Sequence, residues 1–166
     1  LIISYVFPPY PGIGGRRWVK FAKYISKKGI NVHVICSENP FKQKSLYAED
    51  VQQRNIFLYS LKPKYPFVLL TDPSTLFQRI KYKFNILTLK LSTKGSIYDR
   101  AIFWEEQLKN KAAELIKRKK ITTVIATGAP FRINYHASQL KKEFPNLKIV
   151  NDLRDPWTWG VSYGFK

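Results

Sequence analysis

Segments that favour strands alternate along the chain with segments whose apolar residues recur at helical spacing. Five segments favour strands, at residues 1–7, 30–36, 55–60, 121–128 and 147–153. The first of them, LIISYVF, is a continuous apolar run, as expected of a strand covered on both faces. Helical patterns occupy residues 16–28, 97–120 and 130–144, and Gly29 stands where a helix C-terminal glycine belongs. Because strands joined by long crossovers pair in parallel, the pattern predicts an α/β fold: an open doubly wound, mostly parallel sheet with helices on both faces.

The segment 76–91 allows two interpretations. A helix would gather five apolar side chains on one face, namely Leu76, Ile80, Phe84, Leu87 and Leu91. The last residues of the segment, LTLKL, alternate as a strand does, so a helix and a terminal strand both stay open there.

The length of 166 residues and the 45% share of hydrophobic residues predict one globular domain over residues 1–166. No apolar run is long enough to span a bilayer. Cys36 is the single cysteine, and its apolar surroundings predict a buried, inert thiol in a reducing compartment. The chain begins in mid-strand without Met, so we expect it to be a piece of a longer protein.

The charge is strongly positive, with 29 Lys and Arg against 11 Asp and Glu, a net charge of +18. Such an excess points to polyanionic partners: nucleic acid, an anionic membrane or phosphorylated substrates. Residues 16–28 and 73–98 each hold a cluster of basic side chains without an acid. The second cluster contains the four residues that we assign to a membrane surface: Arg79, Lys81, Lys83 and Lys90. A merely solvated surface is the alternative for either cluster.

A glycine-rich stretch, YPGIGGRRW at residues 10–18, connects the first strand to the first helix. It is not a dinucleotide-binding fingerprint, because Arg17 occupies the place of the third glycine. Gly14 and Gly15 instead precede a helix whose free N–H groups and dipole attract anions. With Arg16 beside them, they form a candidate loop for a phosphate or sugar. A flexible turn with surface arginines is the alternative.

Two further strand ends carry candidate ligand groups. In ATGAP, Thr127 offers a hydroxyl and Gly128 permits a close approach to the backbone, although a plain strand-to-helix connection would look the same. In NDLRDPW, Asp152 follows a buried strand and needs a partner or a ligand. Ligands bind at the carboxyl ends of parallel strands, so we expect these segments to share one site with the glycine loop.

Within NDLRDPW, we take Asp152, Arg154 and Asp155 as candidate catalytic residues. Asp155 followed by proline also has a structural explanation, because an acid at a helix N-cap and a proline after it are a favoured pair. Trp157 either stacks on a sugar or closes the core. The two histidines, His33 and His136, are scattered and fit packing better than catalysis, and no metal-ligand spacing exists.

Residues 4–36, 97–131 and 147–157 together resemble the amino-terminal domain of the family 4 glycosyltransferases in a bacterial subgroup. The resemblance covers nearly the whole chain and is weakest between about residues 40 and 95. It implies a Rossmann-like half of a two-domain GT-B enzyme that transfers a hexosyl group with retention of configuration. The carboxyl-terminal half, which holds most nucleotide-sugar contacts, would lie outside this chain. The sequence departs from the family where a histidine often follows a mid-domain strand, since TGAPF stands there and His136 comes later.

The resemblance implies a nucleotide diphosphate sugar as co-substrate, with no cofactor and no required metal. It places Gly14, Gly15 and Arg16 over the donor phosphate and sugar, and it implies that this half mainly shapes the acceptor site, to whose cleft we assign Thr127, Gly128 and Trp157. The acceptor would be a glycan or a lipid-linked molecule of the bacterial cell envelope. We therefore expect a cytoplasmic protein, held peripherally on the inner face of the plasma membrane by the segment 76–94. Two alternatives stay open: a nucleic-acid-binding module, which lacks a recognised motif, and a non-catalytic Rossmann-like domain.

Overall fold

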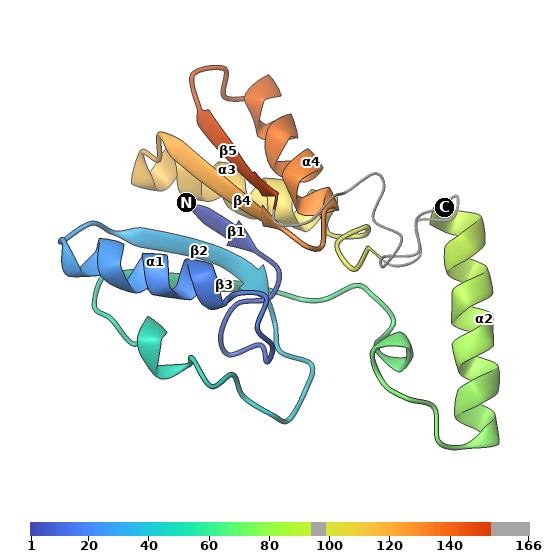
Figure 1. Ribbon diagram of the computed structural model, residues 1–166. Coiled ribbons are helices and arrows are strands. Elements are labelled where there is room, and N and C mark those ends of the chain that lie inside the picture. Colours follow the sequence, from blue (N-terminus) through green and yellow to red (C-terminus); the bar gives the residue numbers. More distant parts are fainter. Residues whose placement is uncertain (94–98, 154–166) are drawn as a thin grey trace.

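A computed structural model describes residues 1–93 and 99–153 of the chain (Figure 1). Its described strands form one sheet of five parallel strands in the order β3-β2-β1-β4-β5. The strands are β1 (Ile2–Ser4), β2 (Val32–Ser37), β3 (Ile56–Leu61), β4 (Thr123–Gly128) and β5 (Lys148–Leu153). The predicted α/β fold with an open parallel sheet is therefore confirmed.

The centre of the sheet is its shortest strand, β1, which pairs with β2 on one side and β4 on the other. Ile2 lies opposite Val34 of β2 and opposite Ile125 of β4. The chain builds the sheet outward in one direction from β1 to β3, then returns and builds in the other direction through β4 and β5. The direction of building reverses between β1 and β4, so the loops that follow these two strands run to opposite sides at the carboxyl edge. Ligands of open parallel sheets bind at such a switch point.

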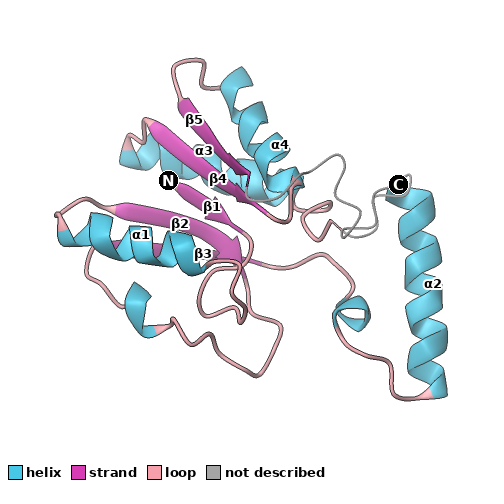
Figure 2. Ribbon diagram, viewed as in Figure 1, coloured by secondary structure: helices cyan, strands magenta, loops and turns pink. Residues whose placement is uncertain are grey.

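Helices cover both faces of the sheet (Figure 2). The main helices are α1 (Arg16–Lys27), α2 (Leu76–Thr93), α3 (Glu105–Lys119) and α4 (Arg132–Gln139). On one face, Val19 and Ala22 of α1 pack with Val34 of β2 in one apolar cluster. On the other, α3 and α4 pack with β1, β2 and β4 in a larger cluster around Leu108 and Ile133. Neighbouring residues of β1 and β2 alternate between the two clusters, so these strands are apolar on both sides. The strand β5, which was predicted to be buried, is instead a largely exposed edge strand.

The helix α2 stands apart from these layers (Figure 1). Among the described elements, its main packing partner is a short 3₁₀ turn at Phe67–Leu70. Leu76–Thr93 is helical throughout, so the helical interpretation of this segment is confirmed and the terminal strand is wrong.

Several predicted boundaries are corrected by local hydrogen bonds. The helix predicted over 97–120 begins only at Glu105, because the Asp99 carboxylate accepts the Ala101 N–H and the chain turns there. The helix predicted over 130–144 ends at Gln139 and continues as a 3₁₀ turn. The strand predicted over 1–7 ends at Ser4. Gly29 has a φ of +79° and closes α1 through its N–H to Ser26, as the sequence predicts.

Candidate functional site

Asp152 ties three elements together at the carboxyl edge of the sheet. It lies near the end of β5, and its Oδ2 accepts a hydrogen bond from the Thr127 hydroxyl of β4 at 2.9 Å. The same oxygen accepts the indole N–H of Trp18 at 2.6 Å and pairs with the guanidinium of Arg17. Trp18 and Arg17 belong to the first turn of α1. One carboxylate therefore fixes the amino end of α1 across β4 and β5.

These contacts keep Asp152 ionised. Burial alone would raise the pKa of the Asp152 carboxyl, but the hydrogen bonds from Trp18, Thr127 and Arg17 outweigh it, and the pKa is lowered. A carboxylate with a lowered pKa is a weak base at neutral pH. The geometry gives Asp152 a positioning role toward Arg17, and its catalytic role stays a prediction.

The glycine loop before α1 is packed by its own backbone. Gly15 is buried, and a Cβ at that position would overlap the carbonyl oxygen of Val6. The Gly15 carbonyl accepts the Val19 N–H at 3.0 Å and so begins α1, while Gly14 is partly exposed beside it. Gly15 is thus required for the loop to pass over Val6, whatever ligand the loop binds.

A basic hollow of about 390 Å³ opens beside this loop, lined by Ile13, Arg16, Arg17 and Lys20. Arg16 is exposed, and its guanidinium lies 5.6 Å from the centre of the Tyr47 ring. Lys20 is bound at 2.5 Å to Asp50, whose pKa the hydrogen bonds from Lys20 and Lys23 lower. Gly15 at the N-cap has no side chain to accept the first N–H groups of α1, and the Arg16 N–H donates instead to the Ile13 carbonyl at 3.1 Å. The three cationic side chains that line the hollow attract anions, although Arg17 and Lys20 are already paired with Asp152 and Asp50.

The two residues predicted at the end of β4 are buried. The Thr127 hydroxyl is used by Asp152 rather than left for a ligand. A Cβ on Gly128 would come within 2.8 Å of the Asn134 amide and 3.1 Å of the Phe131 ring. The space that the glycine leaves is therefore filled by α4, and the described structure gives Gly128 a packing role.

His136, whose role the sequence leaves open, lies on α4 and is 1% exposed. Its Nε2 lies 3.1 Å from the Ala101 carbonyl, and burial is the main cause that lowers its pKa. His136 is therefore a packed core histidine. His33 is also buried, and its Nδ1 lies 3.1 Å from the hydroxyl of Tyr59.

Sequence reasoning missed Asp99, which caps α4 from a distant segment. Its carboxylate accepts the N–H of Arg132, the first residue of α4, at 2.9 Å and that of Ala101 at 3.0 Å. Burial raises the pKa of Asp99, against the lowering effect of these two backbone hydrogen bonds. The available signal was the aspartate itself, a residue that favours turns and caps over helix interiors.

The remaining predicted site residues separate into two groups. The first group lies outside the described residues and consists of Arg154, Asp155 and Trp157. The four residues of the second group lie exposed on α2, which stands apart from β5 (Figure 1): Arg79, Lys81, Lys83 and Lys90. Within residues 1–93 and 99–153, no group of three His, Cys, Asp or Glu side chains is arranged to hold a metal ion. No helix of this part of the chain is long and apolar enough to cross a membrane.

The fold defines a Rossmann-like α/β protein, and a hollow lined by basic side chains lies at the amino end of α1. Comparison of the chain with models of known families, with curated proteins and with solved structures finds no match.

Proposed function

We propose that the chain is the acceptor-side half of a retaining glycosyltransferase of the GT-B type. It would act with a second, nucleotide-binding half to move a hexosyl group from a nucleotide diphosphate sugar to a glycan or lipid-linked acceptor. The observation that carries the proposal is the basic hollow at the amino end of α1, beside the topological switch point. The family resemblance of the sequence supplies the reaction.

The chemistry of such a transfer fits the groups around the hollow. Breaking the bond between sugar and diphosphate builds negative charge on the leaving phosphate. Donors fixed in advance around that charge lower the barrier, and here Arg16, Arg17 and the amino end of α1 would supply them. Asp152 holds Arg17 in place, so that less orientational freedom is lost when the phosphate arrives.

Location follows from the same proposal. A lipid-linked acceptor resides at a membrane, and the net charge of +18 favours an anionic leaflet. We propose a cytoplasmic protein held peripherally at the inner face of the plasma membrane. No cofactor or metal is part of the proposed reaction.

The test is titration of the chain with inorganic pyrophosphate, followed by NMR of the backbone amides. We expect saturable shifts concentrated at residues 14–19, and an affinity reduced about tenfold in Arg16→Ala, the effect of losing one charged hydrogen bond. Arg54→Ala is the matched control, because Arg54 is exposed and precedes β3 at the opposite edge of the sheet. Equal losses in both variants, or shifts spread evenly over surface lysines, would contradict the proposed site.

A further inference from the structure

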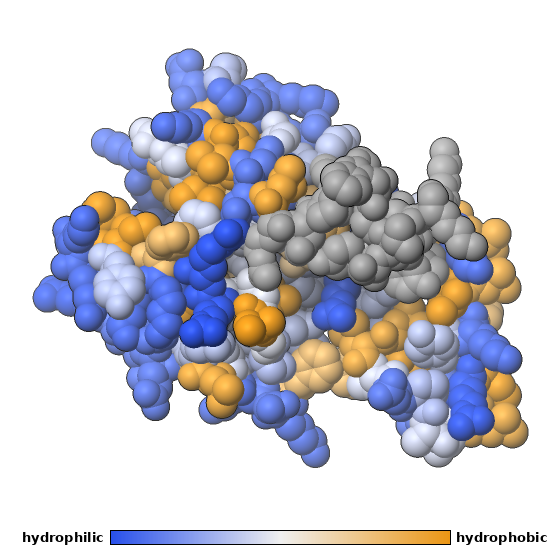
Figure 3. Space-filling view, viewed as in Figure 1, coloured by the Kyte–Doolittle hydropathy of each residue, from blue (hydrophilic) through white to orange (hydrophobic). Residues whose placement is uncertain are grey.

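The helix α2 is apolar on two opposite faces. One face, formed by Tyr82, Ile86, Leu89 and Thr93, turns toward the rest of the molecule, and Leu89 is only 2% exposed. The opposite face carries six large apolar side chains that are each 55–76% exposed: Leu76, Phe77, Ile80, Phe84, Leu87 and Leu91. At 100° per residue these six fill one continuous arc of about 100°. The orange side chains along the outer edge of α2 in Figure 3 belong to this apolar stripe.

An apolar stripe of this size is unusual on a protein surface. Single exposed apolar residues are common, whereas a continuous row on one helix marks a surface that something else covers. The stripe lies along a helix that projects from the rest of the domain, so it suits a flat apolar surface (Figure 1). It runs the length of α2, about 27 Å for 18 residues.

Basic side chains follow both edges of the stripe. At helical spacing, Arg79, Lys83 and Lys90 fall along one edge and Lys81 beyond the other, and residues 73–93 contain no acid. In a symmetric pair of chains joined through the stripe, these cations would face their own copies and repel. Anionic lipid headgroups would instead neutralise them at the depth where the apolar side chains enter the acyl boundary.

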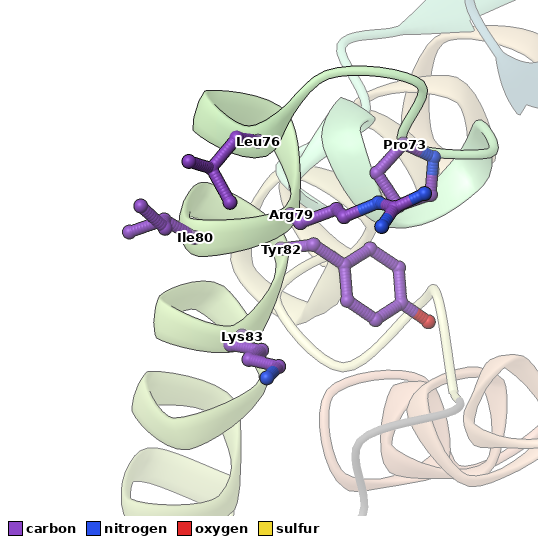
Figure 4. A pocket seen from close by; sticks show the side chains of 6 residues that line it. All are labelled: Pro73, Leu76, Arg79, Ile80, Tyr82 and Lys83. Carbon is purple, nitrogen blue, oxygen red and sulfur yellow. The ribbon is translucent and has the colours of Figure 1, made fainter.

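A hollow at the start of α2 is lined in part by two residues of this basic edge, Arg79 and Lys83. It measures about 540 Å³ and is lined by Pro73, Leu76, Arg79, Ile80, Tyr82 and Lys83. Figure 4 shows Arg79 and Tyr82 extending toward Pro73 on one side of the helix, while Leu76 and Ile80 project from another side. Arg79 and Lys83 therefore line a hollow beside the apolar stripe, where they can contact a headgroup phosphate, while Tyr82 closes the hollow from the inner face of α2.

We propose that α2 is a membrane-docking helix that lies in the surface of an anionic phospholipid bilayer. Its apolar stripe enters the acyl boundary, and Arg79, Lys83 and Lys90 contact headgroup phosphates. The inner face of α2 stays packed on the protein, so the helix lies along the bilayer plane. The helix α2 would thus be the surface that holds the protein at the membrane in the proposed function, but the evidence for docking comes from α2 alone. Vesicle binding is measured without sugar transfer, so the two proposals fail separately.

The test is sedimentation of the chain with vesicles made of equal parts of phosphatidylglycerol and phosphatidylcholine. We expect the native chain to sediment with these vesicles and not with phosphatidylcholine alone. Ile80→Glu and Phe84→Glu should weaken vesicle binding at least about tenfold, because each places a charge at the acyl boundary. Lys83→Gln should weaken it about fivefold. The matched control is Leu46→Glu, the same kind of change at a side chain that is 92% exposed and lies away from α2.

Insertion can be seen directly with a fluorophore on Phe84→Cys. The native Cys36 is buried, and burial raises the pKa of its thiol to about 11, so the label attaches at position 84. A blue shift is expected with anionic vesicles, and none is expected for the label on Leu46→Cys.

Three results would overturn the proposal. In the first, the native chain stays in the supernatant. In the second, Phe84→Glu binds vesicles as tightly as the native chain, which would indicate adsorption by charge alone. In the third, the native chain is a dimer in solution, Phe84→Glu dissociates this dimer, and neither protein binds vesicles. A second copy of the chain, rather than a membrane, would then cover the stripe. Because the changed side chains point outward, circular dichroism should show each variant folded.

Discussion

Replacing Asp152 with alanine should destabilise the fold through three lost hydrogen bonds. The Trp18 and Thr127 hydrogen bonds to the ionised carboxylate are each worth about 1.5 kcal/mol at the lower end of the range for charged acceptors. The Arg17 side chain is 46% exposed, so its ion pair adds only about 0–1 kcal/mol. We expect the free energy of unfolding to fall by about 3–4 kcal/mol, which corresponds to a melting temperature lower by on the order of 10 °C.

The assay is urea unfolding of the native chain and of Asp152→Ala, followed by circular dichroism over a series of pH values. The pKa of Asp152 is lower in the folded state than in the unfolded state. Its contribution is therefore fully present above the unfolded pKa of about 3.9 and is lost as the pH falls through the folded value. We expect the difference between the two proteins to be largest at neutral pH and to shrink only below that unfolded value.

A matched control is Glu143→Ala, which removes the ion pair with Lys117 at 2.7 Å between two side chains that are each more than half exposed. This change should alter the stability little. If Asp152→Ala unfolds at the same urea concentration as the native chain, or if the difference is independent of pH, then Asp152 does not tie α1 to β4 and β5. The positioning role assigned to it would then be wrong.

Three more predictions test the packing around the site. Gly15→Ala should lower the free energy of unfolding by about 1–3 kcal/mol in urea titrations, because its Cβ overlaps the Val6 carbonyl; native stability would refute that packing. Leu108→Ala, a change at a fully buried residue of α3, should cost about 2–5 kcal/mol in the same measurement, and a loss below 1 kcal/mol would place Leu108 outside the core. Cys36 should react with a thiol reagent only after urea unfolds the chain, and fast labelling of the native protein would contradict its burial and raised pKa.

The centre of the sheet could be predicted because β1, β2 and β4 are mostly buried, with helices on both faces. Continuous or alternating apolar runs mark such strands, and the crossovers between them require parallel pairing. Gly29 was likewise predictable, since a helix that ends in a left-handed residue favours glycine. The start of α3 was not, because the helical spacing continues through residues 99–104 while Asp99 turns the chain.

The site was only partly predictable. The sequence identifies Asp152 as a carboxylate in need of a partner, but Arg17 and Trp18 lie 135 and 134 residues away in the chain. Only the strand order, which puts β5 beside β4 next to β1, brings them together. The sequence also shows one apolar face on α2 but not which way it points. The structure buries Leu89 and leaves Phe84 exposed.

The central claim is that the chain helps to bind a nucleotide diphosphate sugar at the amino end of α1. The most direct measurement is transfer of a radiolabelled hexose by the full-length protein, with the native sequence and with Arg16→Ala and Arg54→Ala. We predict labelled product from the native protein and from Arg54→Ala, and a rate lowered about tenfold or more in Arg16→Ala. Equal rates in all three proteins, or no transfer from any nucleotide diphosphate sugar offered, would contradict this claim.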